Sequence, residues 1–412
     1  MSEQQMKKNI AWNTFGSVLY SACQWLITVL VVHISSYEAA GYLSIAMTTS
    51  SSFSAISLFS MRNYQVSDVK GEYSKDVYVG SRITTCIVAL ACCVISSAIG
   101  NSVYQMLCVD AFMLVRVAEA MVDVLHGENQ KFQRYDYIGK SYLLRGVLTI
   151  VSFVLGLILT DNLMITLFFM ALCNLVVAFI YDWRKTTSLE HISPIIWNNQ
   201  VFSLLSKCAP IVVFSFLLSL ENLIPKYILQ QVEGPTPLGV YSTIASPTLI
   251  VQVFASVAFN PLLPGFSSVY LERDYNRFLK MLHKVYAGFI LLSIIVTVGA
   301  IILGRWGLTL LFGKKILTSY ELFLPIVWVT ILTAIIWIFS SIIVAMRKIW
   351  WLLIGMIIDF AIMLPLARPI IINHGSNGIS IVQIILYTLY ITYMVIISEV
   401  LIRRDKNGRS RR

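Results

Sequence analysis

The segment SYELFLPIVWVTILTAIIWIFSSIIVA, residues 319–345, decides the fold of this chain. Its only charged residue is Glu321, and the apolar run after it exceeds the about 20 residues that a helix needs to cross the hydrocarbon core of a membrane. The segment therefore predicts a transmembrane helix, and the same pattern recurs along the chain.

The composition agrees with this prediction. The 412 residues are 57% hydrophobic and 13% charged, with a mean hydropathy of +0.76. Soluble domains carry about 25% charged residues, so lipid is expected to be the solvent for most of this surface. Twelve segments are apolar and long enough to span a membrane, at about 11–34, 39–61, 78–99, 103–125, 138–159, 163–181, 204–229, 238–262, 282–303, 319–345, 350–372 and 379–402.

Basic residues fall mainly in alternate loops between these segments. With a cytoplasmic N-terminus, roughly 25 Lys and Arg residues lie on the cytoplasmic side and roughly 5 outside, Arg82 and Arg145 being counted as cytoplasmic. The chain is therefore predicted to begin with a retained signal anchor and to keep both termini in the cytoplasm. This asymmetry explains the net charge of +10 without nucleic acid, and the basic tail is expected to contact anionic membrane lipids.

A polar break at 182–201 divides the twelve segments into six and six. A short echo supports the division, because Ala40–Ala46 opens the second segment and Leu238–Ala245, of similar sequence, opens the eighth. We expect an all-α polytopic membrane protein of about 12 transmembrane helices in two pseudo-symmetric six-helix bundles. The predicted parts are an N-terminal bundle, 1–181, a cytoplasmic linker, 182–203, and a C-terminal bundle with a basic tail, 204–412.

The sequence offers no motif for catalysis. It contains no P-loop, nucleophile motif or redox motif, its five histidines lack metal-ligand spacing, and its seven cysteines, all in or beside apolar runs, are expected to be reduced. We therefore predict no enzyme, no cofactor and no metal site. A transporter remains, driven by an ion gradient or by the substrate gradient.

Four charged residues lie within the fourth segment: Asp110, Arg116, Glu119 and Asp123. The last three share one face of a helix. A charge within the membrane needs a partner, a wet cavity or access to the interface. These residues are either an ion-paired staple or a polar strip facing a central cavity, and Asp123 alone could reach cytoplasmic water.

The seventh segment contains Glu221, Pro225 and Lys226. Pro225 is expected to kink the helix and expose backbone carbonyls. Glu221 is a candidate for binding a coupling H+ or Na+. Lys226, a little further out, could pair with Glu221, meet an anionic ligand or extend to the outer headgroups.

The first segment carries a polar face formed by Asn13, Ser17, Tyr20 and Gln24. Polar faces of this kind either hold helices together or line a wet pathway. Both interpretations stay open at this point.

Five motifs carry a resemblance to a known family: RNYQVSD (62–68), DVLHGENQ (123–130), YDYIGKS (135–141), NLIPKY (222–227) and FNPLL (259–263). Through them the chain resembles bacterial polysaccharide flippases of the O-antigen or teichoic-acid type, within the multidrug/oligosaccharidyl-lipid/polysaccharide superfamily. The resemblance runs essentially end to end.

The resemblance implies that the chain flips oligosaccharide repeat units linked to undecaprenyl diphosphate, such as those of lipopolysaccharide, and contacts the polysaccharide polymerase. It also implies a twelve-helix fold like that of the multidrug exporters, with a cationic cavity between the two halves. The implied substrate-binding residues are Arg62, Arg116, Lys226, Asn222 and Asn260, and the candidates for ion coupling are Glu221, Glu119 and Asp110.

The main alternative is a cation-coupled exporter of small drugs on the same scaffold. Such an exporter would need acidic residues to dominate its cavity, whereas this chain offers both signs of charge. A membrane polymerase or ligase is disfavoured, because the predicted external loops are short.

Overall fold

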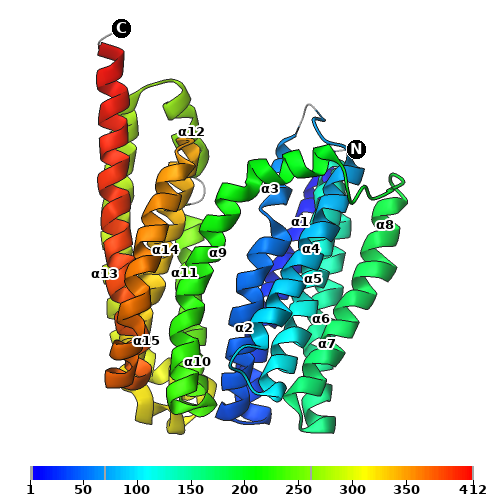
Figure 1. Ribbon diagram of the computed structural model, residues 1–412, viewed down its shortest axis with the longest axis vertical. Coiled ribbons are helices and arrows are strands. Elements are labelled where there is room, and N and C mark those ends of the chain that lie inside the picture. Colours follow the sequence, from blue (N-terminus) through cyan, green and yellow to red (C-terminus); the bar gives the residue numbers. More distant parts are fainter. Residues whose placement is uncertain (1–2, 69–70, 260–261, 411–412) are drawn as a thin grey trace. The chain divides into compact units, whose positions relative to one another are not determined.

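The protein is a bundle of long α-helices (Figure 1). The computed structural model describes residues 3–68, 71–259 and 262–410, and within these ranges it contains no strand. Nine helices of the described residues are long and apolar enough to cross a membrane. The predicted class, a polytopic all-α membrane protein, is confirmed.

In the described residues, each of the twelve predicted segments lies in a helix. The count of long apolar helices is nine because the second and fourth segments do not qualify and the last two segments share one helix. The predicted second and fourth segments form α2 (Tyr37–Leu58) and α5 (Val103–Lys131), where Ser and Thr residues in α2 and charged residues in α5 keep both outside this set of nine. The last two segments form α15 (Ile349–Ser410), which consists of two helices joined at a kink at Gly375.

The chain divides into two compact units, Met1–Leu223 and Ile224–Arg412, called here unit 1 and unit 2. The division falls inside the long helix α9 (Asn199–Glu233). The bundles expected at 1–181 and 204–412, joined by a linker, stay a prediction.

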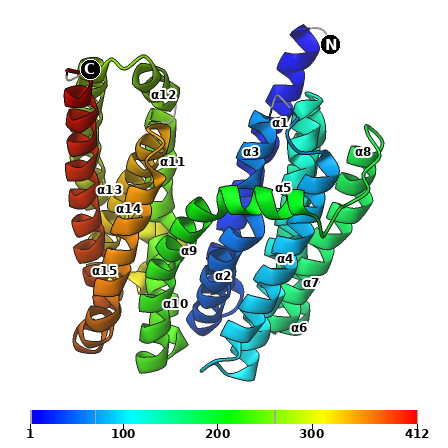
Figure 2. The same ribbon diagram turned by 45° about the horizontal axis from the view of Figure 1, so that its top comes forward.

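Unit 1 is an all-helical bundle, seen in both ribbon views (Figures 1 and 2). The first turns of α9 run across the other helices of this unit, and contacts from Ser203 to Tyr73 and from Lys207 to Glu72 hold them there. Besides α2, α5 and the first part of α9, unit 1 contains α1 (Glu3–Ile34), α3 (Met61–Ser67), α4 (Lys75–Ser97), α6 (Tyr135–Thr160), α7 (Leu163–Val177), a π-helical turn, η1 (Ala178–Trp183), and α8 (Arg184–Thr187).

Capping residues determine where several of these helices begin. The side chains of Ser36, Ser74, Ser102 and Asn162 each accept a hydrogen bond from the backbone N–H three residues later. A cap of this type satisfies a donor that the first turn of a helix cannot pair internally, and it typically stabilises the helix by about 1 kcal/mol. The polar residues between the apolar runs therefore end each segment and start the next.

Helices α1 and α6 touch through glycines. A Cβ atom added to Gly16 would lie 2.2 Å from the carbonyl oxygen of Gly139, and one added to Gly139 would lie 2.2 Å from the carbonyl oxygen of Trp12. Helices associate in membranes chiefly by close packing, and small residues permit the closest backbone approach. This approach positions Tyr20 and Gln24 of α1 beside the polar side chains of unit 1.

The regular elements in the described residues of unit 2 are also all helices, joined by short turns. Its last helix bends at Gly375, where a φ of 54° and a ψ of −134° break the helical geometry. Only glycine adopts this combination readily. Its elements after α9 are α10 (Pro235–Ala245), η2 (Ser246–Thr248), α11 (Leu249–Phe259), α12 (Leu263–Leu271), α13 (Tyr275–Phe312), η4 (Lys314–Leu322), α14 (Phe323–Ala345) and α15.

Candidate functional site

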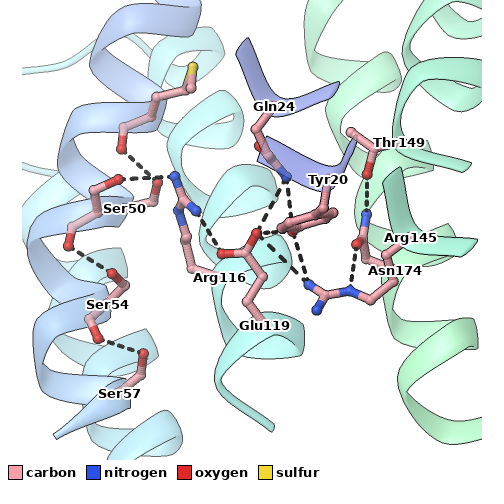
Figure 3. A network of polar contacts seen from close by, with 12 residues as sticks. Tyr20, Gln24, Ser50, Ser54, Ser57, Arg116, Glu119, Arg145, Thr149 and Asn174 are labelled. Atoms are coloured by element: carbon pink, nitrogen blue, oxygen red, sulfur yellow. Dashed lines mark hydrogen bonds and ion pairs between the residues drawn. The ribbon is translucent and has the colours of Figure 1, made fainter. Parts of the chain in front are cut away.

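A network of polar side chains is centred on Glu119 of α5 and joins five helices of unit 1 (Figure 3). The surrounding helices α1, α2, α6 and α7 each supply side chains to it. We call it the Glu119 network: it consists of Tyr20, Gln24, Ser51, Arg116, Glu119, Arg145, Thr149 and Asn174.

One oxygen of Glu119 faces Arg116, one turn earlier on the same helix. The Arg116 Nη1 lies 2.6 Å from Glu119 Oε2, and the Arg116 Nη2 donates to the Ser51 hydroxyl of α2 at 3.1 Å. The sequence prediction that these two charges share a helix face is confirmed.

The other oxygen of Glu119 faces α1 and α6. It accepts the hydroxyl proton of Tyr20 and, at 3.4 Å, an amide proton of Gln24. Arg145 of α6 donates to the Tyr20 hydroxyl at 3.1 Å and lies 3.8 Å from Glu119. The polar face of the first predicted segment thus holds helices together through Tyr20 and Gln24.

Arg145 connects this centre to α7. Its Nε donates to the Asn174 amide oxygen at 3.2 Å, and the Asn174 amide nitrogen donates to the Thr149 hydroxyl at 3.1 Å. The side chain of Arg145 is 2% exposed, whereas those of Arg116 and Glu119 are 20% and 18% exposed. The network therefore has a buried end at Arg145 and an accessible end at Arg116.

The charges of this network do not cancel. Its two guanidinium groups surround a single carboxylate, and buried charges are tolerated only when they are paired and hydrogen-bonded. At the accessible end, Arg116 combines a fixed orientation with the planar donor geometry that suits phosphate oxygens. The arrangement can hold five helices together and also present positive charge to an anion.

A second cluster surrounds Asp123, one turn beyond Glu119. Arg62 lies 3.2 Å from one carboxylate oxygen and Arg82 lies 2.8 Å from the other. Arg82 is fully buried and also donates to the Ser57 carbonyl at 2.7 Å. Asp123 therefore binds two arginines, and it is not simply a side chain extended towards water.

Arg82 and Arg145 were predicted to lie with the basic residues of the cytoplasmic loops, and this prediction is wrong for both side chains. Both are buried within the helix bundle, Arg82 on α4 and Arg145 on α6. Their positions inside the predicted segments 78–99 and 138–159 were the signal available in the sequence. Their partners come from other helices, and no sequence spacing reveals them.

A third cluster contains a buried histidine. His126 Nε2 lies 3.2 Å from one oxygen of Asp182, and the Ser141 hydroxyl donates to the other at 2.9 Å. Asp182 lies in the π-helical turn η1, an irregularity that is often found at functional sites. His126 and Ser141 belong to two of the motifs that carry the family resemblance.

The remaining predicted site residues lie apart from these clusters. Asp110 lies in the N-terminal part of α5, and its carboxylate accepts a hydrogen bond from Ser97 at 2.8 Å. On α9, Glu221 is fully buried, Asn222 is exposed and Lys226 is half-buried. Helix α9 continues through Pro225, and the kink expected there stays a prediction. Asn260 lies outside the described residues.

The described residues contain no group of three or more His, Cys, Asp or Glu side chains arranged to hold a metal ion. All seven cysteines are free thiols.

The fold is one that multidrug transporters and a lipid II flippase share. The lipid II flippase MurJ in an inward closed conformation aligns with a TM-score of 0.69 at 13% identity, over 93% of this chain and 88% of that one. An inward-facing multidrug resistance MATE transporter of the MOP superfamily aligns with a TM-score of 0.67 at 12% identity, over 97% and 99%. The Vibrio cholerae MATE transporter VcmN, as a mutant, aligns at 0.63 and 13%, over 97% of both chains.

Sequence comparison points to polysaccharide biosynthesis. The chain is 26% identical over 317 residues to the capsular polysaccharide biosynthesis protein CapF of Staphylococcus aureus, which covers 75% of this chain and 78% of that protein. No family model matches the sequence. By sequence the chain is thus similar to a capsular polysaccharide biosynthesis protein, and by fold to MATE transporters and MurJ, which agrees with the resemblance that the five motifs indicated.

Proposed function

We propose that the chain is a flippase that moves oligosaccharide repeat units linked to undecaprenyl diphosphate from the inner to the outer leaflet of the bacterial cytoplasmic membrane. The observation that carries this proposal is the similarity over 317 residues to a capsular polysaccharide biosynthesis protein, on a fold shared with a lipid II flippase. Transport is by alternating access and is coupled to an H+ or Na+ gradient. Both termini are cytoplasmic, and the polysaccharide polymerase is the expected neighbour.

The proposed contacts to the diphosphate are Arg62, Arg116 and Lys226. Arg62 and Arg116 retain 26% and 20% exposure although each is paired with a carboxylate. A guanidinium can exchange a carboxylate partner for a phosphate with the same bidentate geometry. Asn222 and Asn260 are proposed to bind the glycan, because amide groups both donate and accept hydrogen bonds.

The proposed ion-coupling residues are Glu221, Glu119 and Asp110. Glu221 is fully buried on α9, whereas Glu119 accepts a hydrogen bond from Tyr20 and forms ion pairs with Arg116 and Arg145. A change in the protonation or ion occupancy of Glu119 would alter the charge presented beside Arg116.

The decisive experiment removes the encoding gene from its host. We expect loss of surface polysaccharide and accumulation of complete undecaprenyl-linked repeat units inside the cell, both reversed by the wild-type gene. Normal surface polysaccharide with no accumulated intermediate would contradict the proposal.

The alternative is a cation-coupled exporter of small drugs, which the alignment with multidrug transporters over 97% of the chain favours. This function predicts that the deletion strain becomes more sensitive to cationic dyes while its surface glycan stays normal. The same strain therefore separates the two functions.

A further inference from the structure

Unit 2 contains an open pocket of about 380 Å³. Its lining residues all come later in the sequence than those of the Glu119 network, so it is a separate site. It lies where the start of α10, the short helix η4 and the bend of α15 come together, at the end of unit 2 opposite the C-terminus (Figure 1). Its volume is near the lower end of the roughly 300–1,000 Å³ typical of small-molecule sites. The space suits one sugar ring.

Backbone irregularities in three separate segments form this pocket. Gly234, with a φ of 89°, precedes α10, and Ser319 departs from helical geometry within η4. Gly375 bends α15 and brings the residues on both sides of the bend to the pocket wall. The φ of 54° at Gly375 favours glycine, and the flexible end of the Glu233 side chain lies 2.6 Å from where a Cβ atom would stand.

The wall of the pocket is rich in uncharged hydrogen-bonding groups. Hydroxyl, amide, imidazole and carboxylate groups together offer both donors and acceptors. The amide oxygen of Asn377 is buried and accepts no hydrogen bond from the described part of the chain. This oxygen is closed to solvent, so the Asn377 amide would have to turn towards the pocket, where a ligand hydroxyl could supply the missing hydrogen bond. The polar lining consists of Thr236, Ser319, Glu321, His374, Ser376 and Asn377.

The rest of the lining is apolar, from Pro237, Val240 and Leu322. A pyranose ring has a rim of hydroxyl groups and an apolar C–H face, and it matches this combination. A diphosphate does not, because the lining contains no Lys or Arg and includes the carboxylate of Glu321. A divalent cation fits poorly as well, since Glu321 is the only carboxylate in the lining.

We propose that this pocket binds one sugar residue of the oligosaccharide that the chain exports, on the external side of the membrane. The proposal rests on the proposed function and on the predicted orientation, which makes all three turns external. Binding here would retain the glycan after it has crossed, while its lipid anchor stays in the bilayer.

The test uses the full-length protein in lipid nanodiscs and isothermal titration calorimetry. The probe is the oligosaccharide repeat unit released by mild acid from the host's lipid-linked intermediates and freed of phosphate. We expect the wild type to bind it, and Asn377→Ala and Glu321→Gln each to weaken binding about tenfold, the scale of one lost hydrogen bond to a ligand. Asn373→Ala is the matched control, because Asn373 is exposed four residues away and does not line the pocket, so binding should not change.

Two further probes distinguish other ligands. Undecaprenyl diphosphate without glycan and CaCl2 should bind equally to wild type and to both pocket variants. The proposal is overturned if the oligosaccharide does not bind, if both variants bind it as tightly as the wild type, or if Glu321→Gln removes only Ca²⁺ binding.

Failure of the proposed function would look different. Normal surface glycan in the deletion strain, together with oligosaccharide binding that depends on Asn377, would contradict export and leave a sugar-binding pocket. Export that requires the chain, without measurable oligosaccharide binding, would overturn the pocket alone.

Discussion

Arg116 Nη1 lies 2.6 Å from Glu119 Oε2, and the two residues are three positions apart on α5. The pair explains how two charges can remain within a membrane-spanning bundle, because each compensates the other and both keep further hydrogen bonds to neighbouring helices. A staple and a substrate contact predict different results when Arg116 is removed. A staple affects the amount of folded protein, and a substrate contact affects export.

We expect Arg116→Ala and Lys226→Ala each to abolish glycan export while protein abundance stays within about twofold of the wild type. Glu119 would keep Tyr20 and Arg145 as partners after loss of Arg116, so the bundle should survive. The measurements are surface glycan and immunoblots of membranes from a complemented deletion strain. Lys280→Ala, at an exposed position of α13, is the control. If both variants retain full export, these residues do not bind the substrate.

Arg82→Ala should destabilise the protein more than any loss of an exposed arginine. The fully buried Arg82 pairs with Asp123 and donates to the Ser57 carbonyl, and a hydrogen bond to a charged group typically contributes about 1.5–3 kcal/mol. The melting temperature of purified protein in detergent should fall by several degrees. Arg277→Ala, at an exposed position, should leave it unchanged. Equal melting temperatures for the two variants would contradict this role of Arg82.

Gly139→Ala should separate α1 from α6. The added methyl group would lie 2.2 Å from the Trp12 carbonyl, and overpacking of this kind costs about 1–3 kcal/mol. Gly299→Ala is a matched control on α13, because nothing lies within 4 Å of its added Cβ. Thermal unfolding should therefore show a loss of stability for the first variant and no loss for the second. A stable Gly139→Ala protein would show that the two helices can move apart freely.

Asp68, in the loop after α3, should make the protein less stable as the pH becomes acidic. Partial burial acts to raise the pKa of Asp68, but hydrogen bonds from the backbone N–H groups of Glu72 and Tyr73 and from the Tyr78 hydroxyl outweigh it and lower this pKa below its ordinary value. A carboxyl with a lowered folded-state pKa stabilises the fold above its unfolded pKa of about 4, and this contribution is lost as the pH falls through the folded-state value.

Asp68→Asn should therefore lower the melting temperature at pH 7 and flatten its decline below about pH 4. Asp161→Asn is the control, because Asp161 is exposed at the end of α6 and asparagine tolerates its left-handed backbone. Melting curves of the three proteins between pH 3 and pH 7 test this. Parallel curves for wild type and Asp68→Asn would show that the Asp68 hydrogen bonds do not favour its charged form.

The long apolar helices could be predicted from the sequence because hydropathy and capping are local properties. The polar helices α2 and α5 were also predicted, although their side chains make them poor spans by themselves. Their polar groups are tolerated because they face one another, as Ser51 and Arg116 do. The bend of α15 at Gly375 corresponds to the polar interval between the last two predicted segments.

The sequence alone determined the helical segments, the charge asymmetry and the helix face shared by Arg116 and Glu119, since each depends on residues near one another in the chain. The tertiary structure decided which charges meet: Arg145 with Glu119, Arg82 with Asp123, and His126 with Asp182. These pairs depend on how helices rotate and approach, for example where Gly16 meets Gly139. That arrangement is fixed by packing of whole surfaces, and hydropathy carries no information about it.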